Sequence, residues 1–336
     1  MAKIPLSLVI PTRNRPDALG RLLDNISRQS LSASAFEVVI VDDGSTPPID
    51  QADLKAKFAS LNLKILRRDA DHGAHQSRAD GARLARAARV LFLDDDVLPA
   101  PTVLADHARD VGNFSVGPIF YHGGSDLSPY VRMQTKSYDK YFNSLINGPR
   151  TTREIEFFIC NASGPTTEFS EFLDSVHEAM RGVPMGGEGF DESIMHIEAT
   201  RRGYCFTILP DAIVWHVDTR TLDDARRGRR RNGRIACTLA LDRAKPQPEI
   251  DGIFDIGGVL SGRRGLPRMY KAKLVWKAAW AMDAAADILT FLADRGPKRW
   301  LPSGLCYLPL AVAFWQGVRD VAPSWEALEA SLSDRH

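Results

Sequence analysis

The sequence has little of several features that would fix a protein's class at once. Only four cysteines occur in 336 residues and no two form a CxxC pair, which argues against a disulfide framework or a zinc site. Basic and acidic side chains number 43 and 42, so bulk electrostatic attraction to nucleic acid is not expected. There is no internal repeat and no long low-complexity tract. The cysteines are interpreted as small core residues: Cys160, Cys205, Cys237 and Cys306.

Long hydrophobic runs are scarce as well. The first residues, 1–5, lead directly into a strand-like segment and lack the apolar stretch and cleavage site of a secretory signal, so we expect a cytoplasmic protein. One uncharged segment, 300–318, approaches the length of a transmembrane helix, but prolines and glycines interrupt it: Pro302, Gly304, Pro309 and Gly317. This segment is predicted to be buried or to lie on a membrane surface, at the inner face if the protein is peripheral.

The first hundred residues alternate between strand and helix patterns. Apolar segments 6–10, 36–41, 61–66 and 90–93 are predicted strands. A helix is expected after the first strand, with Asn14 as its cap, Pro16 at its start, and an apolar face formed by Leu19, Leu22, Leu23 and Ile26. Residues 81–88 are interpreted as the later part of another helix. This alternation predicts an α/β fold, in which ligands bind at the carboxyl ends of the strands.

Three adjacent carboxylates, Asp94, Asp95 and Asp96, follow the apolar run 89–93. Such a cluster repels itself unless a proton or a cation separates the charges. Mg²⁺ or Mn²⁺ often bridges one or two carboxylates to the phosphates of a nucleotide, so the cluster indicates phosphate chemistry. The alternative is a solvated acidic turn that ends the strand.

Three segments together resemble the family 2 glycosyltransferases of GT-A fold. They are Ser7–Arg15 (SLVIPTRNR), Glu37–Thr46 (EVVIVDDGST) and Leu93–Asp96 (LDDD), in this order and spacing. The resemblance covers roughly residues 5–220. It implies a Rossmann-like mixed sheet with flanking helices that binds a nucleotide-diphospho-sugar, followed by a mainly helical C-terminal extension. The implied organisation is a nucleotide-sugar-binding half at 1–100, an acceptor-binding half at 101–220, and the extension at 221–336.

The resemblance implies a set of residues for the donor. Pro11, Thr12 and Arg13 would line the nucleotide pocket. Of the pair Asp42 and Asp43, the second is the better match to the acid that accepts a hydrogen bond from a uracil N–H, although the pair also fits a simple turn. Arg78 resembles the arginine that approaches the donor diphosphate; a solvated helix arginine is the alternative.

The resemblance makes the acidic cluster the DxD motif. Asp94 and Asp95 would lie near the ribose and the metal waters, with Asp94 a possible further ligand, and Asp96 would bind the metal directly. His216 matches a histidine that completes the metal shell in some members, and imidazole suits Mn²⁺ better than Mg²⁺. A structural histidine after an apolar strand is the alternative.

Inverting transfer needs a carboxylate that accepts the acceptor's proton. The sequence offers Glu192 by register, and Asp191 or the upstream Glu188 if side-chain length matters more, because the family's Glu-Asp order is reversed here. These acids could instead cap the following helix. Ile194 and Glu198 depart from the family pattern on the acceptor side, whereas the polar side chains of 161–163 (Asn-Ala-Ser) could contact sugar hydroxyls.

Beyond residue 100 the pattern loosens. We expect strands at 114–121 and 155–160, a helix at 167–180, a Pro/Gly-rich connector at 245–267 and helices from about residue 270. An arginine-rich run, 226–234, could close over the diphosphate, touch anionic lipid headgroups or stay solvated.

The hypothesis is therefore an inverting, Mn²⁺- or Mg²⁺-dependent glycosyltransferase. It would move a single sugar from a nucleotide donor, UDP-linked, to a saccharide, lipid-linked or other hydroxyl acceptor. The Gln-x-x-Arg-Trp signature of processive synthases is absent. A nucleotidyltransferase is one alternative, but the loop after the first strand is not a glycine-rich phosphate loop. A noncatalytic sugar-nucleotide-binding protein is the other.

Overall fold

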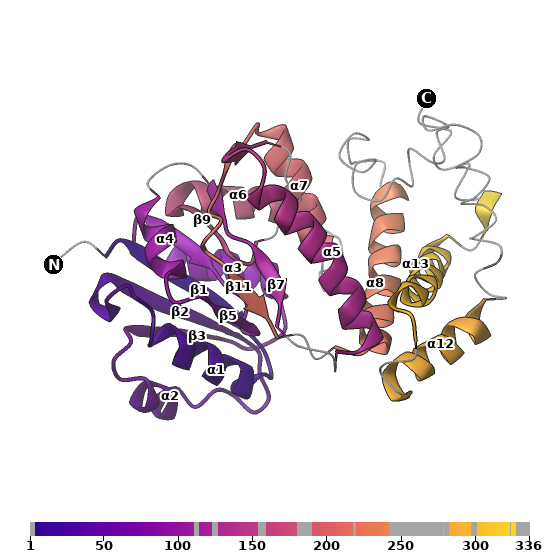
Figure 1. Cartoon of the computed structure of the whole chain (residues 1–336), viewed down its shortest axis with the longest axis horizontal. Helices are drawn as coiled ribbons and strands as arrows, with labels where there is room; N and C mark the ends of the chain where they lie inside the picture. Colours follow the sequence, from indigo (N-terminus) through magenta and orange to yellow (C-terminus); the bar gives the residue numbers. More distant parts are fainter. Residues whose placement is uncertain are drawn as a thin grey trace. The chain divides into compact units, whose positions relative to one another are not determined.

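The structure is a computed structural model that describes residues 4–110, 114–122, 127–153, 159–179, 190–217, 220–241, 278, 282–296, 301–322 and 324–326 (Figure 1). The chain divides into two compact units, each described here by itself. The first consists of Met1–His122, Thr135–Met180 and Glu198–Asp218. The second consists of Gly123–Gln134, Arg181–Ile197 and Thr219–His336.

A mixed eight-stranded sheet forms the centre of the first unit. Its strand order is β3-β2-β1-β4-β9-β6-β10-β8. The first four strands in this order are parallel, and β9 runs antiparallel to both β4 and β6. The strands are β1 (Leu6–Thr12), β2 (Phe36–Asp43), β3 (Leu63–Arg68), β4 (Arg89–Phe92), β6 (Phe114–Val116), β8 (Thr151–Thr152), β9 (Ala162–Pro165) and β10 (Phe206–Ile208).

A second, three-stranded sheet continues from the end of β4. It has the order β5-β11-β7, with β5 (Val97–Pro99) antiparallel and β7 (Ile119–Tyr121) parallel to the central strand β11 (Val214–His216). Because β5 follows Asp96 directly and pairs Val97 with His216, the small sheet brings the acidic cluster next to the end of β11.

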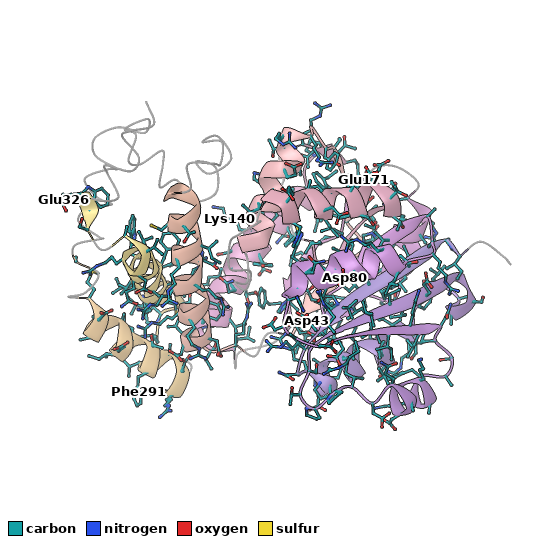
Figure 2. The ribbon with its side chains drawn as sticks, turned by 180° about the vertical axis from the view of Figure 1, so that it is seen from behind. Asp43, Asp80, Lys140, Glu171, Phe291 and Glu326 are labelled. Atoms are coloured by element: carbon teal, nitrogen blue, oxygen red, sulfur yellow. The ribbon has the colours of Figure 1, made fainter. Side chains whose placement is uncertain are left out.

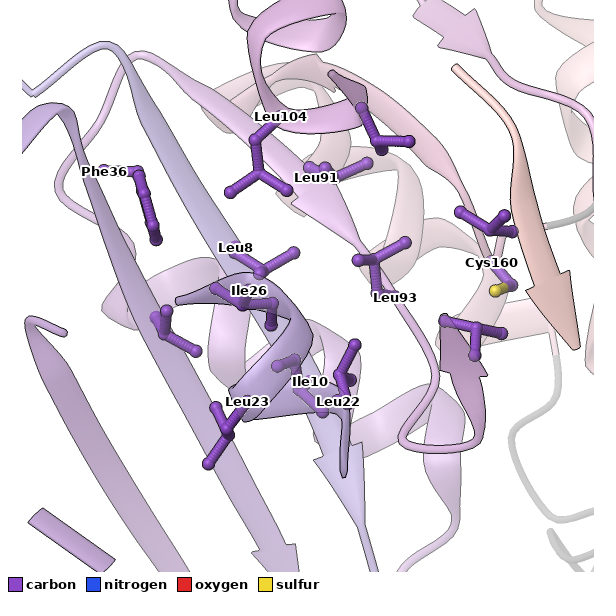
Figure 3. Packing of buried hydrophobic residues seen from close by; sticks show 14 of the residues in the cluster. Leu8, Ile10, Leu22, Leu23, Ile26, Phe36, Leu91, Leu93, Leu104 and Cys160 are labelled. Carbon is purple, nitrogen blue, oxygen red and sulfur yellow. The ribbon is translucent and has the colours of Figure 1, made fainter. Parts of the chain in front are cut away.

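Helices cover both faces of the large sheet. Leu8 and Ile10 of β1 point toward α1 (Pro16–Ile26), whose predicted apolar face is fully buried, and Leu104 of α4 (Val103–Arg109) joins the same cluster (Figure 3). The alternate residue Val9 faces the other side, where α3 (Ala74–Leu84) approaches so closely at Gly81 that a Cβ would lie 2.4 Å from a Val9 methyl. Other helices that lie wholly or partly in the first unit are η1 (Ala33–Ala35), α2 (Gln51–Lys57), α5 (Pro129–Ile146), α6 (Thr166–Ala179) and α7 (Phe190–Arg201).

The predicted α/β fold with flanking helices is confirmed, and the early strands and the helix near 167–180 lie close to their expected places. Three local expectations are wrong. The expected strand at 114–121 is two strands, β6 and β7, which lie in different sheets and are separated by Gly117 and Pro118. Helix α3 ends at Leu84, before 85–88. Asn14 does not cap α1; its side chain accepts a hydrogen bond from Thr46 N at 2.7 Å, and Arg15 is the cap residue without a capping bond.

Some expectations fall outside the part of the chain that the structure describes. They concern most of the strand at 155–160 and the whole connector at 245–267. Cys160, Cys237 and Cys306 are buried, as expected for core residues, whereas Cys205 is half-buried.

The second unit is helical in its described part, which confirms a helical C-terminal region. It contains α8 (Leu222–Leu241), α12 (Asp283–Arg295), η2 (Ser303–Cys306) and α13 (Tyr307–Val321). The uncharged segment 300–318 therefore includes η2 and most of α13, whose apolar side chains such as Leu310 and Val318 are buried. Among the described helices, none is both long enough and apolar enough to cross a membrane.

Two glycines let α8 and α13 pack backbone against backbone. A Cβ at Gly317 would lie 1.9 Å from the carbonyl oxygen of Arg230, and a Cβ at Gly233 would lie 2.0 Å from that of Phe314. No rotamer change relieves these clashes, because the neighbouring atoms belong to the backbone. The two helices can pack this closely only with hydrogen at both positions.

Replacing Gly317 with alanine is therefore expected to lower the free energy of unfolding by about 3 kcal/mol, since the helices must move apart. Gly228→Ala is the matched control: Gly228 lies in the same helix pair, a Cβ there would meet no neighbouring group within 4 Å, and alanine should stabilise α8 by about 0.5–1 kcal/mol. Urea unfolding monitored by circular dichroism measures both. Equal stability of the two variants would contradict the close packing.

Candidate active site

The candidate site lies where β1, β2 and β4 end. In the register of the sheet Thr12 pairs with Asp42, and β4 runs parallel on the other side of β1. The loops that follow these strands therefore meet at one edge, as the alternation pattern predicts. This edge carries Thr12, the pair Asp42 and Asp43, and the acidic cluster 94–96.

Each aspartate of the cluster has a different partner. Asp94 Oδ1 accepts a hydrogen bond from Arg78 Nη2 at 2.5 Å, and Asp95 Oδ2 accepts one from Thr12 Oγ1 at 2.7 Å. Asp96 Oδ2 accepts one from Arg15 Nη1 at 2.7 Å. The alternative of a solvated acidic turn is wrong, because Asp95 is buried and each of the three carboxylates is held by a named donor.

The three carboxylates differ in their preference for a proton. Burial acts to raise the pKa of Asp94, but the charge and hydrogen bond of Arg78 outweigh it and lower this pKa. Burial raises the pKa of Asp95 to about 6, against the bond from Thr12 and the charge of Arg15. The cluster therefore combines a carboxylate whose charge Arg78 favours with a buried one whose charge is costly, as expected where a further cation would bind.

Asp96 and His216 form a pair of oxygen and nitrogen donors. Asp96 Oδ1 lies 3.4 Å from His216 Nε2, and both side chains are mostly buried. Within the described ranges, no group of three or more His, Cys, Asp or Glu side chains is arranged to hold a metal ion. Mg²⁺ and Mn²⁺ at nucleotide sites use few protein ligands together with phosphate oxygens, so this two-donor set fits such an ion.

Arg15 is a site residue to which the sequence assigned no role. Its guanidinium lies between Asp96, at 2.7 Å, and Asp95, at 3.3 Å. It therefore places a positive charge beside the two donors that would bind a dication. The sequence could have indicated this residue, because Arg15 lies in the loop after the first strand, at the same sheet edge as the acids.

Arg15→Gln is expected to raise the affinity for Mn²⁺ alone by at least about fivefold, because a competing cation is removed from Asp96. Arg13→Gln is the matched control: Arg13 pairs with exposed Asp71 at 2.5 Å, so Mn²⁺ affinity should not change. Isothermal titration with MnCl₂ in the absence of nucleotide measures both. Weaker Mn²⁺ binding by Arg15→Gln would show that the guanidinium supports the metal site.

Asp42 and Asp43 organise the neighbouring loops. Asp42 accepts hydrogen bonds from Ser45 N at 2.9 Å and from Arg67 Nη1 at 2.6 Å, and these bonds overcome the effect of burial and lower its pKa. Asp43 accepts bonds from the backbone N–H groups of His72 and Gly73, at 3.1 and 2.8 Å. The turn interpretation thus holds for Asp42, while Asp43 connects the loops after β2 and β3.

The side chain of Arg78 is buried on α3, so the alternative of a solvated helix arginine is wrong. Figure 2 shows Asp80 on the same helix and Asp43 at the strand ends. Arg68 Nη1 binds Asp80 at 2.9 Å, and Arg68 Nε lies 3.8 Å from Asp43. Basic side chains from β3 and α3 therefore approach the acids of this edge.

The candidate base residues belong to the second unit. Glu188 lies outside the described residues, and Asp191 and Glu192 are in the first turn of α7. In the first unit, Glu198 binds Arg201 and Arg202 at 2.8 and 2.6 Å, and these hydrogen bonds overcome burial and lower its pKa to about 2. Glu198 therefore has a structural role in place of the basic residue expected from the family.

Asn161 and Ser163 do not contact sugar; that expectation is wrong because both side chains are fully buried. Asn161 Nδ2 donates to the carbonyl oxygens of Pro118 and Ala212, at 3.1 and 2.7 Å, and these two bonds fix the amide orientation. Its Oδ1 lies 3.0 Å from His107 Nε2, so this nitrogen carries the proton and Nδ1 accepts the bond from Ser163 Oγ at 2.7 Å. The network ties α4 to the segments that precede β7 and β11.

Burial lowers the pKa of His107 to about 4, against the opposing effect of the Asn161 bond. The unfolded chain, with a histidine pKa of about 6.5, therefore takes up this proton first as the pH falls. Stability from this group is complete above pH 6.5, and we expect it to decrease by about 1.4 kcal/mol per pH unit between pH 6.5 and 4.

His107→Gln should remove this slope even if the variant is less stable at every pH, whereas exposed His177→Gln should retain it. Urea midpoints measured at several pH values across this window test the expectation. An unchanged slope in His107→Gln would contradict a neutral, buried imidazole.

The chain is similar in sequence to one family of known proteins. Residues 7–168 match the model of Glycosyl transferase family 2. The matched part contains β1, β2 and the acidic cluster, and the predicted resemblance to that family is confirmed over these residues.

Relatives with known names match only part of the chain. A validoxylamine A glucosyltransferase of Streptomyces hygroscopicus subsp. jinggangensis is 40% identical over 108 residues, which are 31% of this chain and 25% of that protein. Glycosyltransferase AglE of Haloferax volcanii is 30% identical over 140 residues, 41% of this chain and 45% of that protein. The chain thus spans about a quarter of the first relative and under half of the second.

Solved structures match over most of the chain at low similarity. S. aureus TarS 1-349 in complex with UDP-GlcNAc is 17% identical, with a TM-score of 0.47 and coverage of 96% of this chain and 91% of that one. Mannosyltransferase PcManGT from Pyrobaculum calidifontis, in complex with GDP-Man and Mn²⁺, is 19% identical, with a TM-score of 0.48 and coverage of 99% and 86%. Both TM-scores lie below 0.5.

Proposed function

We propose that this protein is an inverting, metal-dependent glycosyltransferase that moves one sugar from a UDP-linked donor to an acceptor hydroxyl. The observation that carries the proposal is the arrangement of the acidic cluster in a family 2 domain. Asp94 is held by Arg78, Asp95 by Thr12, and Asp96 lies 3.4 Å from His216, all at the carboxyl ends of parallel strands. Such an edge is where open α/β sheets bind nucleotides.

The donor would bind at residues 1–100. Pro11, Thr12 and Arg13 would line the nucleotide pocket, and Asp43 would accept a hydrogen bond from the base. Support for Asp43 over Asp42 comes from their contacts: Asp42 already binds Arg67 and Ser45, whereas the bonds that Asp43 accepts at 2.8 and 3.1 Å come from backbone N–H groups. Each oxygen of Asp43 keeps a lone pair for a base N–H.

Asp96 and His216, with Asp94 nearby, would hold Mn²⁺ or Mg²⁺, and Arg78 would approach the diphosphate. The ion would supply positive charge that stabilises the departing nucleoside diphosphate. The chain's own contribution is positioning: Thr12 would hold Asp95 and Arg78 would hold Asp94 in place through the hydrogen bonds that they donate.

The acceptor would bind at residues 101–220, with Glu192, or otherwise Asp191 or Glu188, removing its proton. The acceptor is a saccharide, a lipid-linked intermediate or another hydroxyl compound. We place the enzyme in the cytoplasm, with the extension at 221–336 near the inner face of the membrane when the acceptor is lipid-linked.

The test is to incubate the purified full chain with MnCl₂ and each of a panel of UDP-, GDP- and dTDP-sugars. Turnover is measured as the amount of nucleoside diphosphate released. We expect slow hydrolysis of a UDP-sugar without acceptor and an inverted anomeric configuration in the product by NMR. Tight binding of a UDP-sugar, with no turnover in the presence of any acceptor tested, would identify a noncatalytic sugar-nucleotide-binding protein. Release of pyrophosphate from a nucleoside triphosphate and a sugar phosphate would identify a nucleotidyltransferase.

A further inference from the structure

Large exposed apolar side chains are confined to one part of the described chain. Ile288, Phe291 and Leu292 lie on α12 and are 60%, 58% and 42% exposed; the others are Leu305 in η2 and Tyr307 at the start of α13. The three on α12 follow the spacing i, i+3, i+4, so they lie on one face of the helix. Figure 2 shows Phe291 at the outer edge of α12.

The acids of α12 have partners on the neighbouring helices. Asp294 accepts hydrogen bonds from the backbone N–H groups of Leu222 and Asp223 at the start of α8, at 2.7 and 3.1 Å. Asp287 binds Arg226 of α8 at 2.8 Å, and Asp283 accepts a hydrogen bond from Gln316 of α13. Each of these carboxylates therefore has a partner within the unit, although the side chain of Asp287, one turn before Phe291, is 68% exposed.

The outer face of α12 carries a positive charge. The guanidinium of Arg295 lies over the ring of Phe291, 5.7 Å from its centroid, and continues the same face one turn further. The face formed by Ile288, Phe291, Leu292 and Arg295, called here the α12 face, is thus apolar and cationic.

We propose that the α12 face binds the surface of a membrane that contains anionic lipid. An apolar stripe beside basic side chains is the pattern of a helix that lies in the plane of the lipid headgroups. With 13 residues, α12 is about 20 Å long and is too short to span the hydrocarbon core.

Other basic residues of this unit contribute less to the argument because they bind acids within it. Arg230 and Arg234 both contact Asp320, at 2.9 and 2.6 Å, and Arg227 binds Asp223 and Asp224. The arginine-rich run 226–234 is therefore largely structural in α8, and the lipid contact is assigned to α12. The inference goes beyond the proposed transfer reaction and holds independently of it.

The experiment is co-sedimentation of the full chain with phosphatidylcholine vesicles, with and without phosphatidylglycerol. We expect binding only with phosphatidylglycerol. The double variant Ile288→Ser/Phe291→Ser should reduce the partition coefficient by at least about tenfold, and Arg295→Gln by about fivefold. Leu305→Ser is the matched control, because Leu305 is as exposed as Leu292 and lies outside α12. Circular dichroism verifies that each variant is folded.

Three results would overturn the proposal. Equal binding to vesicles with and without phosphatidylglycerol would show that the negative charge of the lipid does not contribute to binding. A loss of binding in Leu305→Ser as large as in the double variant would place the contact outside the α12 face. A dimer of the wild type by light scattering, converted to a monomer by Ile288→Ser/Phe291→Ser, would show that a second copy occupies this face.

Discussion

Asp96→Asn is expected to lower kcat/KM for sugar transfer by about a thousandfold. One oxygen of Asp96 lies 3.4 Å from His216 Nε2 and the other 2.7 Å from Arg15 Nη1. The carboxylate is thus next to a second candidate metal ligand, His216, and next to the positive charge of Arg15. An amide keeps the size of this side chain but lacks the negative charge that would hold a dication. Initial rates with a saturating UDP-sugar, over a range of MnCl₂ concentrations, measure the effect.

Direct Mn²⁺ titration separates the role of Asp96 from a loss of folding. Asp96→Asn should bind Mn²⁺ at least about tenfold more weakly, the opposite of the change expected for Arg15→Gln. Asp174→Asn is the control, since Asp174 is an exposed acid on α6 that pairs with Arg83. Wild-type Mn²⁺ affinity together with wild-type turnover in Asp96→Asn would show that another residue holds the metal.

Local patterns in the sequence were sufficient to predict the core of this site. A continuous apolar run that ends in acids indicates a buried strand and its carboxyl end, and parallel strands bring such ends together. The acids at 42–43 and 94–96 and the loop at 11–15 therefore lie at one sheet edge, as expected. The apolar face of α1 was also predictable, because leucines at 19, 22 and 23 follow the helical period.

Pairing between side chains could not be predicted in the same way, because it depends on contacts between distant segments. Arg15 and Asp96 are 81 residues apart in sequence, and Arg78 and Asp94 are 16 apart. Asn161 illustrates the same limit. A short polar motif resembles a surface site, yet its amide is fully buried and holds two carbonyl groups that only the fold brings near.

The sequence contains an indication that the strand expected at 114–121 is interrupted, although its apolar pattern favours one continuous strand. Gly117-Pro118 is a dipeptide typical of turns. The structure adds a packing reason, because a Cβ at Gly117 would lie 2.2 Å from the carbonyl oxygen of Ala212. After these two residues the chain continues as β7 of the small sheet, next to β11 and His216.

Glu192→Gln is expected to lower kcat by about a thousandfold while leaving the affinity for the UDP-sugar donor within about twofold. A base acts on the acceptor hydroxyl in the transition state and contributes roughly 10²–10⁴-fold in typical enzymes. Glutamine retains the length of the side chain and cannot accept the proton. Single-turnover rates and donor titration, measured on the same preparation, separate the two effects.

Asp191→Asn is the matched control for Glu192→Gln. Both residues belong to the first turn of α7, where successive backbone positions are about 100° apart around the helix axis. We expect Asp191→Asn to retain kcat within about tenfold. The acidic limb of the kcat–pH profile, which reports the base in the enzyme–substrate complex, should disappear in Glu192→Gln and persist in Asp191→Asn. The reverse pattern would make Asp191 the base, and loss of the limb only in Glu188→Gln would assign the proton transfer to the glycine-rich segment before α7.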